Sequence, residues 1–95
     1  MQQDKINAIR EYLQQQFPES KIDDTDDFDR CGHKFRALEQ KNVLLASVSD
    51  EVAEDNSKES LVNILKNYGL PNLMKEHPGS IVLIGLNNVH ILPIK

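Results

Sequence analysis

The chain has 95 residues, enough for one domain and too few for two, so we expect a single domain over residues 1–95. Hydrophobic residues make up 39% and charged residues 27%, which excludes a disordered, collagen-like or repetitive chain. Lys and Arg number 11 against 15 Asp and Glu, so the formal net charge is -4. The single cysteine excludes a disulfide within the chain and favours a reducing compartment.

The sequence carries no recognisable export or membrane signal. Its first twenty residues hold charges and glutamines where a signal peptide would need an apolar core. The most apolar stretch, residues 80–95, is interrupted by glycine, asparagine, histidine and proline, and it is shorter than the roughly 20 apolar residues of a membrane-spanning helix. We therefore expect a cytoplasmic protein with no membrane partner.

A first long helix is predicted near the N-terminus. Asp4 is available as its N-cap, and Pro18 ends it because the residue before a proline is pushed out of the helical region. Apolar residues follow one another at helical spacing between these limits: Ile6, Ile9, Leu13 and Phe17.

A second long helix is predicted after Asn56, which together with Glu59 resembles a capping box. Gly69 followed by Pro71 ends this helix. One face is apolar at positions i, i+3, i+4 and i+7: Leu61, Ile64, Leu65 and Tyr68. Residues 50–54 and 71–76 are candidates for short additional helical turns.

Residues 20–29 are predicted to form a loop or an edge strand, because five aspartates repel one another and favour turns. Residues 33–38 and 43–48 then form the clearest hairpin. Strand alternation requires an even number of loop residues if one face is to collect Phe35, Ala37, Leu44, Ala46 and Val48. Lys34 and Arg36 then point to the opposite face.

A C-terminal hairpin is predicted from residues 81–86 and 89–92, joined by a two-residue turn at Asn87 and Asn88. Both of its faces are apolar, with one face formed by Val82, Ile84, Val89 and Ile91 and the other by Ile81, Leu83 and Leu92. An antiparallel strand with one wet face should instead alternate between apolar and polar residues. Ile81, Leu83 and Leu92 are therefore the candidate self-association residues.

These elements predict an α+β fold. We expect an antiparallel sheet of four to five strands, a meander plus the C-terminal hairpin, with two main helices packed on one face.

Three patterns suggest metal or catalytic chemistry, and each is incomplete. An EF-hand alignment starting at Asp27 puts Cys31 and Leu38 at positions that need oxygen ligands. Asp29, Cys31 and His33 would share one face of an extended segment, but they form no complete zinc ligand set and no oriented nucleophile pair. The acid-x-Lys pattern of residues 39–41, typical of metal-dependent nucleases, falls at a predicted turn. We expect no cofactor, metal or catalytic residue, and a metal-dependent enzyme is the least favoured alternative.

Charge is segregated along the chain. Residues 19–29 hold six acids against one lysine and residues 50–59 hold five against one, whereas residues 30–41 hold four basic residues against one acid. A nucleic-acid-binding β-ribbon could use Arg30, Lys34 and Arg36, which share strand parity. The acidic flanks and the lack of aromatic residues make nucleic acid the less favoured partner. The candidate interaction surface is Asp23, Asp24, Asp26, Asp27, Asp29, Arg30, Lys34 and Arg36.

The preferred functional prediction is a small non-enzymatic binding or regulatory module that acts through protein–protein contacts. The partner is an unknown protein, with a homodimer as one candidate.

Overall fold

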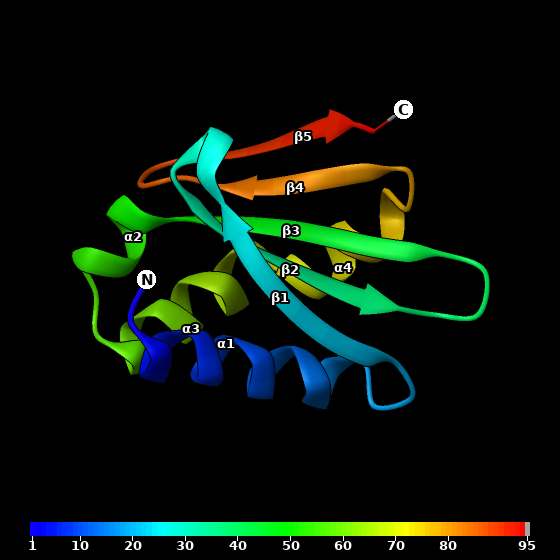
Figure 1. Ribbon diagram of the computed structural model, residues 1–95, viewed down its shortest axis with the longest axis horizontal. Helices are drawn as coiled ribbons and strands as arrows, with labels where there is room; N and C mark the ends of the chain where they lie inside the picture. The colour runs from blue at the N-terminus through cyan, green and yellow to red at the C-terminus, as the bar shows by residue number, and fades with distance from the viewer. Residues whose placement is uncertain (95) are drawn as a thin grey trace.

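The computed structural model describes residues 1–94, which form four α-helices, one short 3-10 helix and five strands (Figure 1). In chain order the elements are α1 (Gln3–Gln16), β1 (Lys21–Asp27), η1 (Phe28–Arg30), β2 (Gly32–Leu38), β3 (Val43–Ser49), α2 (Asp50–Glu54), α3 (Lys58–Tyr68), α4 (Leu70–Glu76), β4 (Ser80–Ile84) and β5 (Val89–Pro93).

The five strands form one sheet in the order β1-β2-β3-β4-β5. Neighbouring strands are antiparallel except for β3 and β4, which are parallel. The α+β prediction is confirmed, with one difference from an all-antiparallel sheet. Helices α2, α3 and α4 carry the chain back along the sheet before β4 begins, and such a crossover is what joins parallel neighbours.

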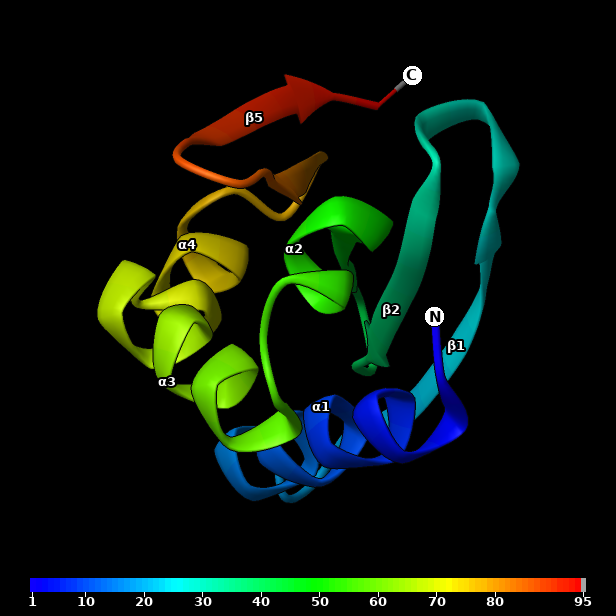
Figure 2. The same cartoon turned by 90° about the vertical axis from the view of Figure 1, so that its left-hand side faces the viewer.

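The helices gather on one side of the sheet, which curves around them (Figure 2). The core lies between these two layers, where apolar stripes of α1 and α3 meet the inner face of the strands. Its fully buried side chains include Ile9, Leu13, Phe35, Leu61 and Leu65. No described helix has the length and hydrophobicity needed to span a membrane.

Both N-cap predictions for the long helices were wrong by one or two residues. Gln2 is the N-cap of α1, and Asp4 lies within its first turn, where a negative charge favours the helix N-terminus. Ser57, whose hydroxyl accepts from the amide of Ser60, is the N-cap of α3. Asn56 instead donates to the Val52 carbonyl at the end of α2.

The register of the β2–β3 hairpin confirms the even loop, because Phe35 pairs with Ala46 and Ala37 with Leu44 across a connection of four residues, 39–42. In the C-terminal hairpin, the predicted turn at Asn87 and Asn88 is a longer connection, residues 85–88. The Gly85 amide donates to the Asn88 carbonyl at 2.9 Å, and neither asparagine has a positive φ. The loop is still even, so the predicted division of the two faces is preserved.

Candidate interaction surface

The face of the sheet turned away from the helices carries a group of apolar side chains on β2 to β5. Strand register places Leu45, Ile81 and Leu92 side by side in one row across β3, β4 and β5. Their strand neighbours Ala46, Val82 and Ile91 point the other way, toward the helices. We call this group, together with Ile94 directly after β5, the open-face patch: Leu38, Val43, Leu45, Ile81, Leu83, Leu92 and Ile94.

The members of the open-face patch differ in exposure. Val43 and Leu92 are each 42% exposed and Ile94 is 45% exposed, whereas Ile81 is only 2% exposed. Ile81 therefore lies at the base of the patch between its neighbours in the row, although sequence reasoning placed it among the surface contacts. Leu83 is half-buried, so Leu92 is the most exposed of the three predicted self-association residues.

The aspartates of β1 are divided between the two faces of the sheet. Asp23 pairs with Arg36 on the open face, where the Arg36 Nε and one terminal nitrogen each donate to a separate carboxylate oxygen at 2.6 Å. This bidentate hydrogen bond lowers the pKa of Asp23 and raises the pKa of Arg36.

Asp27 is buried at the other end of β1. Its carboxylate accepts from the Ser47 hydroxyl at 2.9 Å and lies 3.2 Å from an Arg30 guanidinium nitrogen. Arg30 lies in η1, so strand alternation does not extend to it. Strand position therefore supports the predicted stripe for Lys34 and Arg36, which lie on the open face, and makes no statement about Arg30. Asp29 also lies in η1, outside the strand.

Asp24 and Asp26 point to the helix side of the sheet and bracket His33. The His33 Nε2 lies 2.7 Å from Asp24, and its Nδ1 lies 3.2 Å from Asp26. Arg10 of α1 also lies 3.3 Å from Asp24. Polar contacts of His33, Asp24, Asp26 and Arg10 therefore link α1, β1 and β2. Sequence reasoning missed this cluster, although the alternation of aspartates in residues 23–27 was the available signal.

The structure does not bring Asp29, Cys31 and His33, the incomplete pattern considered for metal or catalytic chemistry, onto one face. Cys31 is exposed and takes a left-handed φ of 51°, whereas the His33 ring is buried among the β1 carboxylates. Within residues 1–94, no group of three or more His, Cys, Asp or Glu side chains is arranged to hold a metal ion. Residues 39–41 lie in the β2–β3 connection, as predicted.

The second acidic segment begins in α2. Asp50 lies in the first turn of that helix, and one of its carboxylate oxygens is 3.6 Å from the amino terminus of the chain. That charge pair joins the start of α1 to α2.

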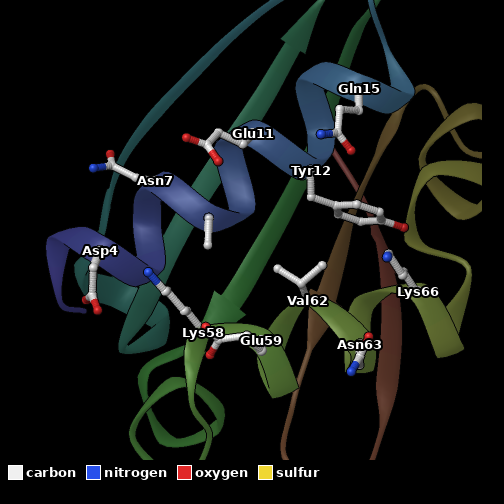
Figure 3. Close-up of a pocket in the computed structure, with 11 residues that line it drawn as sticks. Asp4, Asn7, Glu11, Tyr12, Gln15, Lys58, Glu59, Val62, Asn63 and Lys66 are labelled. Atoms are coloured by element: carbon white, nitrogen blue, oxygen red, sulfur yellow. The ribbon is translucent and has the colours of Figure 1, made fainter.

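A hollow of about 600 Å³ lies between α1 and α3 on the helical side (Figure 3). The Tyr12 ring and Val62 line it together with amide side chains and charges of both signs. Lys66 approaches Tyr12, with its Nζ 5.9 Å from the ring centroid, and burial raises the pKa of the Tyr12 hydroxyl. His33 does not line this hollow. Because Lys58 and Lys66 share it with Asp4, Glu11 and Glu59, the lining has no single charge preference.

Comparisons with protein-family models, curated proteins and solved structures found no match.

Proposed function

We propose that the protein is a non-enzymatic binding module whose open-face patch docks an apolar surface of a partner protein. The observation that carries this proposal is the row of Leu45, Ile81 and Leu92, which lies on the face opposite the helices.

Leaving the apolar side chains of that face in water is energetically unfavourable. An antiparallel sheet with one solvated face normally places polar side chains there. Here Val43, Leu92 and Ile94 remain more than 40% exposed. Several exposed apolar side chains on one sheet face are typical of an interaction site.

The polar surroundings of the patch match the rim of a protein interface. Arg36 lies in the same row as Leu45, with Asp23 beyond it, and Lys34 lies beside Ser47. An apolar centre with a charged edge is the usual anatomy of such an interface. The Asp23–Arg36 pair at this edge would contribute more to orientation than to affinity.

The alternative functions have weaker support. A phosphate-binding stripe needs available cations, but Arg36 is held by Asp23 and Arg30 by Asp27. An enzyme built on Asp29, Cys31 and His33 would need these side chains to converge.

The test compares two lysine substitutions at apolar residues of nearly equal exposure. Val43 is 42% exposed within the open-face patch, and Leu86 is 41% exposed in the β4–β5 connection, outside it. Immobilised wild type, Val43→Lys and Leu86→Lys are used to capture proteins from an extract of the cells that make this chain. Retained proteins are then quantified by mass spectrometry.

We expect a defined set of proteins to be retained by wild type and Leu86→Lys and reduced about tenfold or more by Val43→Lys, because a buried charge in the interface costs more than about 1.4 kcal/mol. Equal retention by both variants, or no specific retention by wild type, would reject the open-face patch as the docking site. A salt titration with labelled DNA and RNA completes the test, since tight binding with a steep salt dependence would favour the nucleic-acid alternative.

A further inference from the structure

Within residues 1–94, strand β5 is the last strand of the sheet and has a hydrogen-bonded neighbour on one side only. Its backbone directions follow from two bonds that close the β4–β5 ladder. The Gly85 amide donates to the Asn88 carbonyl, and the Ile94 amide donates to the Gly79 carbonyl. In an antiparallel ladder the residues bonded to the neighbour recur at every second position, so His90 and Leu92 also direct their backbone groups toward β4.

The intervening residues therefore direct their backbone groups away from the sheet. Val89 and Ile91 each present an amide and a carbonyl to the free edge, and Pro93 presents a carbonyl alone. Such a row of backbone donors and acceptors is a template for pairing with another strand.

The two edges of the sheet are protected very differently. Strand β1, at the opposite edge, carries five charged side chains in seven residues, which is a usual device against edge pairing. Strand β5 carries no Asp, Glu, Lys or Arg, and Pro93 blocks its last position only. Leu92, which points to the open face, is 42% exposed on this unprotected strand.

We infer that β5 pairs antiparallel with β5 of a second copy of this chain, around a two-fold axis at Ile91. In this register the two Ile91 residues exchange both of their hydrogen bonds. Each Val89 amide donates to the carbonyl of Pro93 in the other copy, which adds two more bonds. Pro93 has no amide hydrogen, so the bonds from Pro93 to the Val89 carbonyl of the other copy are absent. The pairing is therefore self-complementary with four backbone hydrogen bonds.

When two copies associate, their charge favours contact through β5 over contact through β1. The net charge is -4, so two copies repel one another, and the aspartate-rich β1 lies at the opposite edge of the sheet. Pairing through β5 keeps these aspartates far apart, whereas pairing through β1 would bring them together.

The pairing also joins the two open faces. Because a two-fold axis perpendicular to the sheet preserves the faces, the helices of both copies lie on the same side. Leu92 of one copy then lies close to His90 and Leu92 of the other, and the two open-face patches become one surface. The pairing itself does not require the docking function proposed above. The use of the joined patches as one docking surface rests on that proposed function.

The test measures amide hydrogen exchange by NMR together with sedimentation, over protein concentrations from about 10 μM to 1 mM. Residues His90 and Leu92 should be protected at every concentration, since their amides bond to β4. The amides of Val89 and Ile91 should exchange freely when dilute and about tenfold more slowly as the dimer forms.

Two substitutions at one position separate the backbone from the side chain. Ile91→Pro removes the central donor of the pairing, which is unused within the monomer, so we expect a folded monomer. Ile91→Ala keeps the donor and should still form a dimer. Thermal melting checks that both variants fold. If Ile91→Pro does not fold, the exchange measurements on wild type still test the inference.

Three results would overturn the inference. They are a monomer at about 1 mM, a dimer in which the Val89 and Ile91 amides remain unprotected, and a folded Ile91→Pro variant that dimerises as wild type does. Failure of the docking proposal is distinguishable, because it is read from Val43→Lys in the capture experiment.

Discussion

Gly32, at the start of β2, has a role that depends on the absence of a side chain. A Cβ atom there would lie 2.6 Å from the backbone carbonyl oxygen of Val48 and 3.3 Å from the Ser47 hydroxyl. The bond from Ser47 to Asp27 joins β3 to β1 across β2 near this position. Because β2 lies between β1 and β3, a side chain larger than glycine at position 32 would obstruct the contact between Ser47 and Asp27. Glycine is therefore required at position 32, because the Val48 backbone cannot shift without a cost in free energy.

We expect Gly32→Ala to lower the free energy of unfolding by about 1–3 kcal/mol, because the added methyl group overpacks the strand. Gly79→Ala is the matched control, since a Cβ at Gly79 meets nothing within 4 Å and its φ is not positive. Its expected effect lies within about 0.5 kcal/mol of zero or is slightly stabilising. Urea unfolding of both variants is the measurement, and equal losses would contradict the close-approach argument.

Strand β1 is attached to the fold largely through its polar side chains. It buries Ile22 and, at its end, Asp27, while Asp24 and Asp26 hold the His33 ring between them. An edge strand with so little apolar burial depends on such contacts to remain paired.

The two carboxylates that bracket His33 should not contribute equally. Asp24 has the shorter contact, a second partner in Arg10 and a side chain that is 21% exposed, whereas the side chain of Asp26 is 58% exposed. We expect Asp24→Asn to cost about 1–3 kcal/mol of unfolding free energy and Asp26→Asn less than about 1 kcal/mol. Urea unfolding ranks the two, and amide exchange should locate the loss of protection in β1. The reverse ranking would mean that His33 is held mainly by Asp26.

The elements were largely predictable because their signals are local. Pro18 and Gly69 limit the long helices, and the alternation around Phe35 and Ala37 defines the inner face of the β2–β3 hairpin. The parallel pairing of β3 with β4 could not be predicted in this way, since it depends on how α2, α3 and α4 cross the sheet. Serine and asparagine are both favoured as N-caps, so N-cap propensity does not distinguish Ser57 from its neighbour Asn56.

The charged surface was harder to predict than the fold. Sequence reasoning grouped eight charged residues into one interaction surface, but strand alternation divides the aspartates between two faces. Asp23, Asp24 and Asp27 then find partners within the chain. Pairings such as Asp23 with Arg36 connect positions 13 residues apart, so they require the hairpin register as well as the charges. Pairing with cations of the same chain therefore accounts for three of the five aspartates in residues 23–29.

The acid stability of the whole domain should reflect one of these pairs. The hydrogen bond from Arg36 lowers the pKa of Asp23 in the folded protein relative to the unfolded chain. The stability that this pair contributes is therefore fully present above the unfolded pKa and is lost as the pH falls through the folded pKa.

We expect Asp23→Asn to lose stability at neutral pH and to show a flatter decline below about pH 4, the range in which an unperturbed aspartate titrates. Both side chains are partly exposed, so the effect should be modest and should weaken with added salt. Asp29→Asn makes the same change of charge in η1 and is the control. Urea midpoints measured from pH 7 to pH 2 provide the comparison. If the two variants follow the same curve, net charge and not the Asp23–Arg36 pair accounts for the acid sensitivity of the domain.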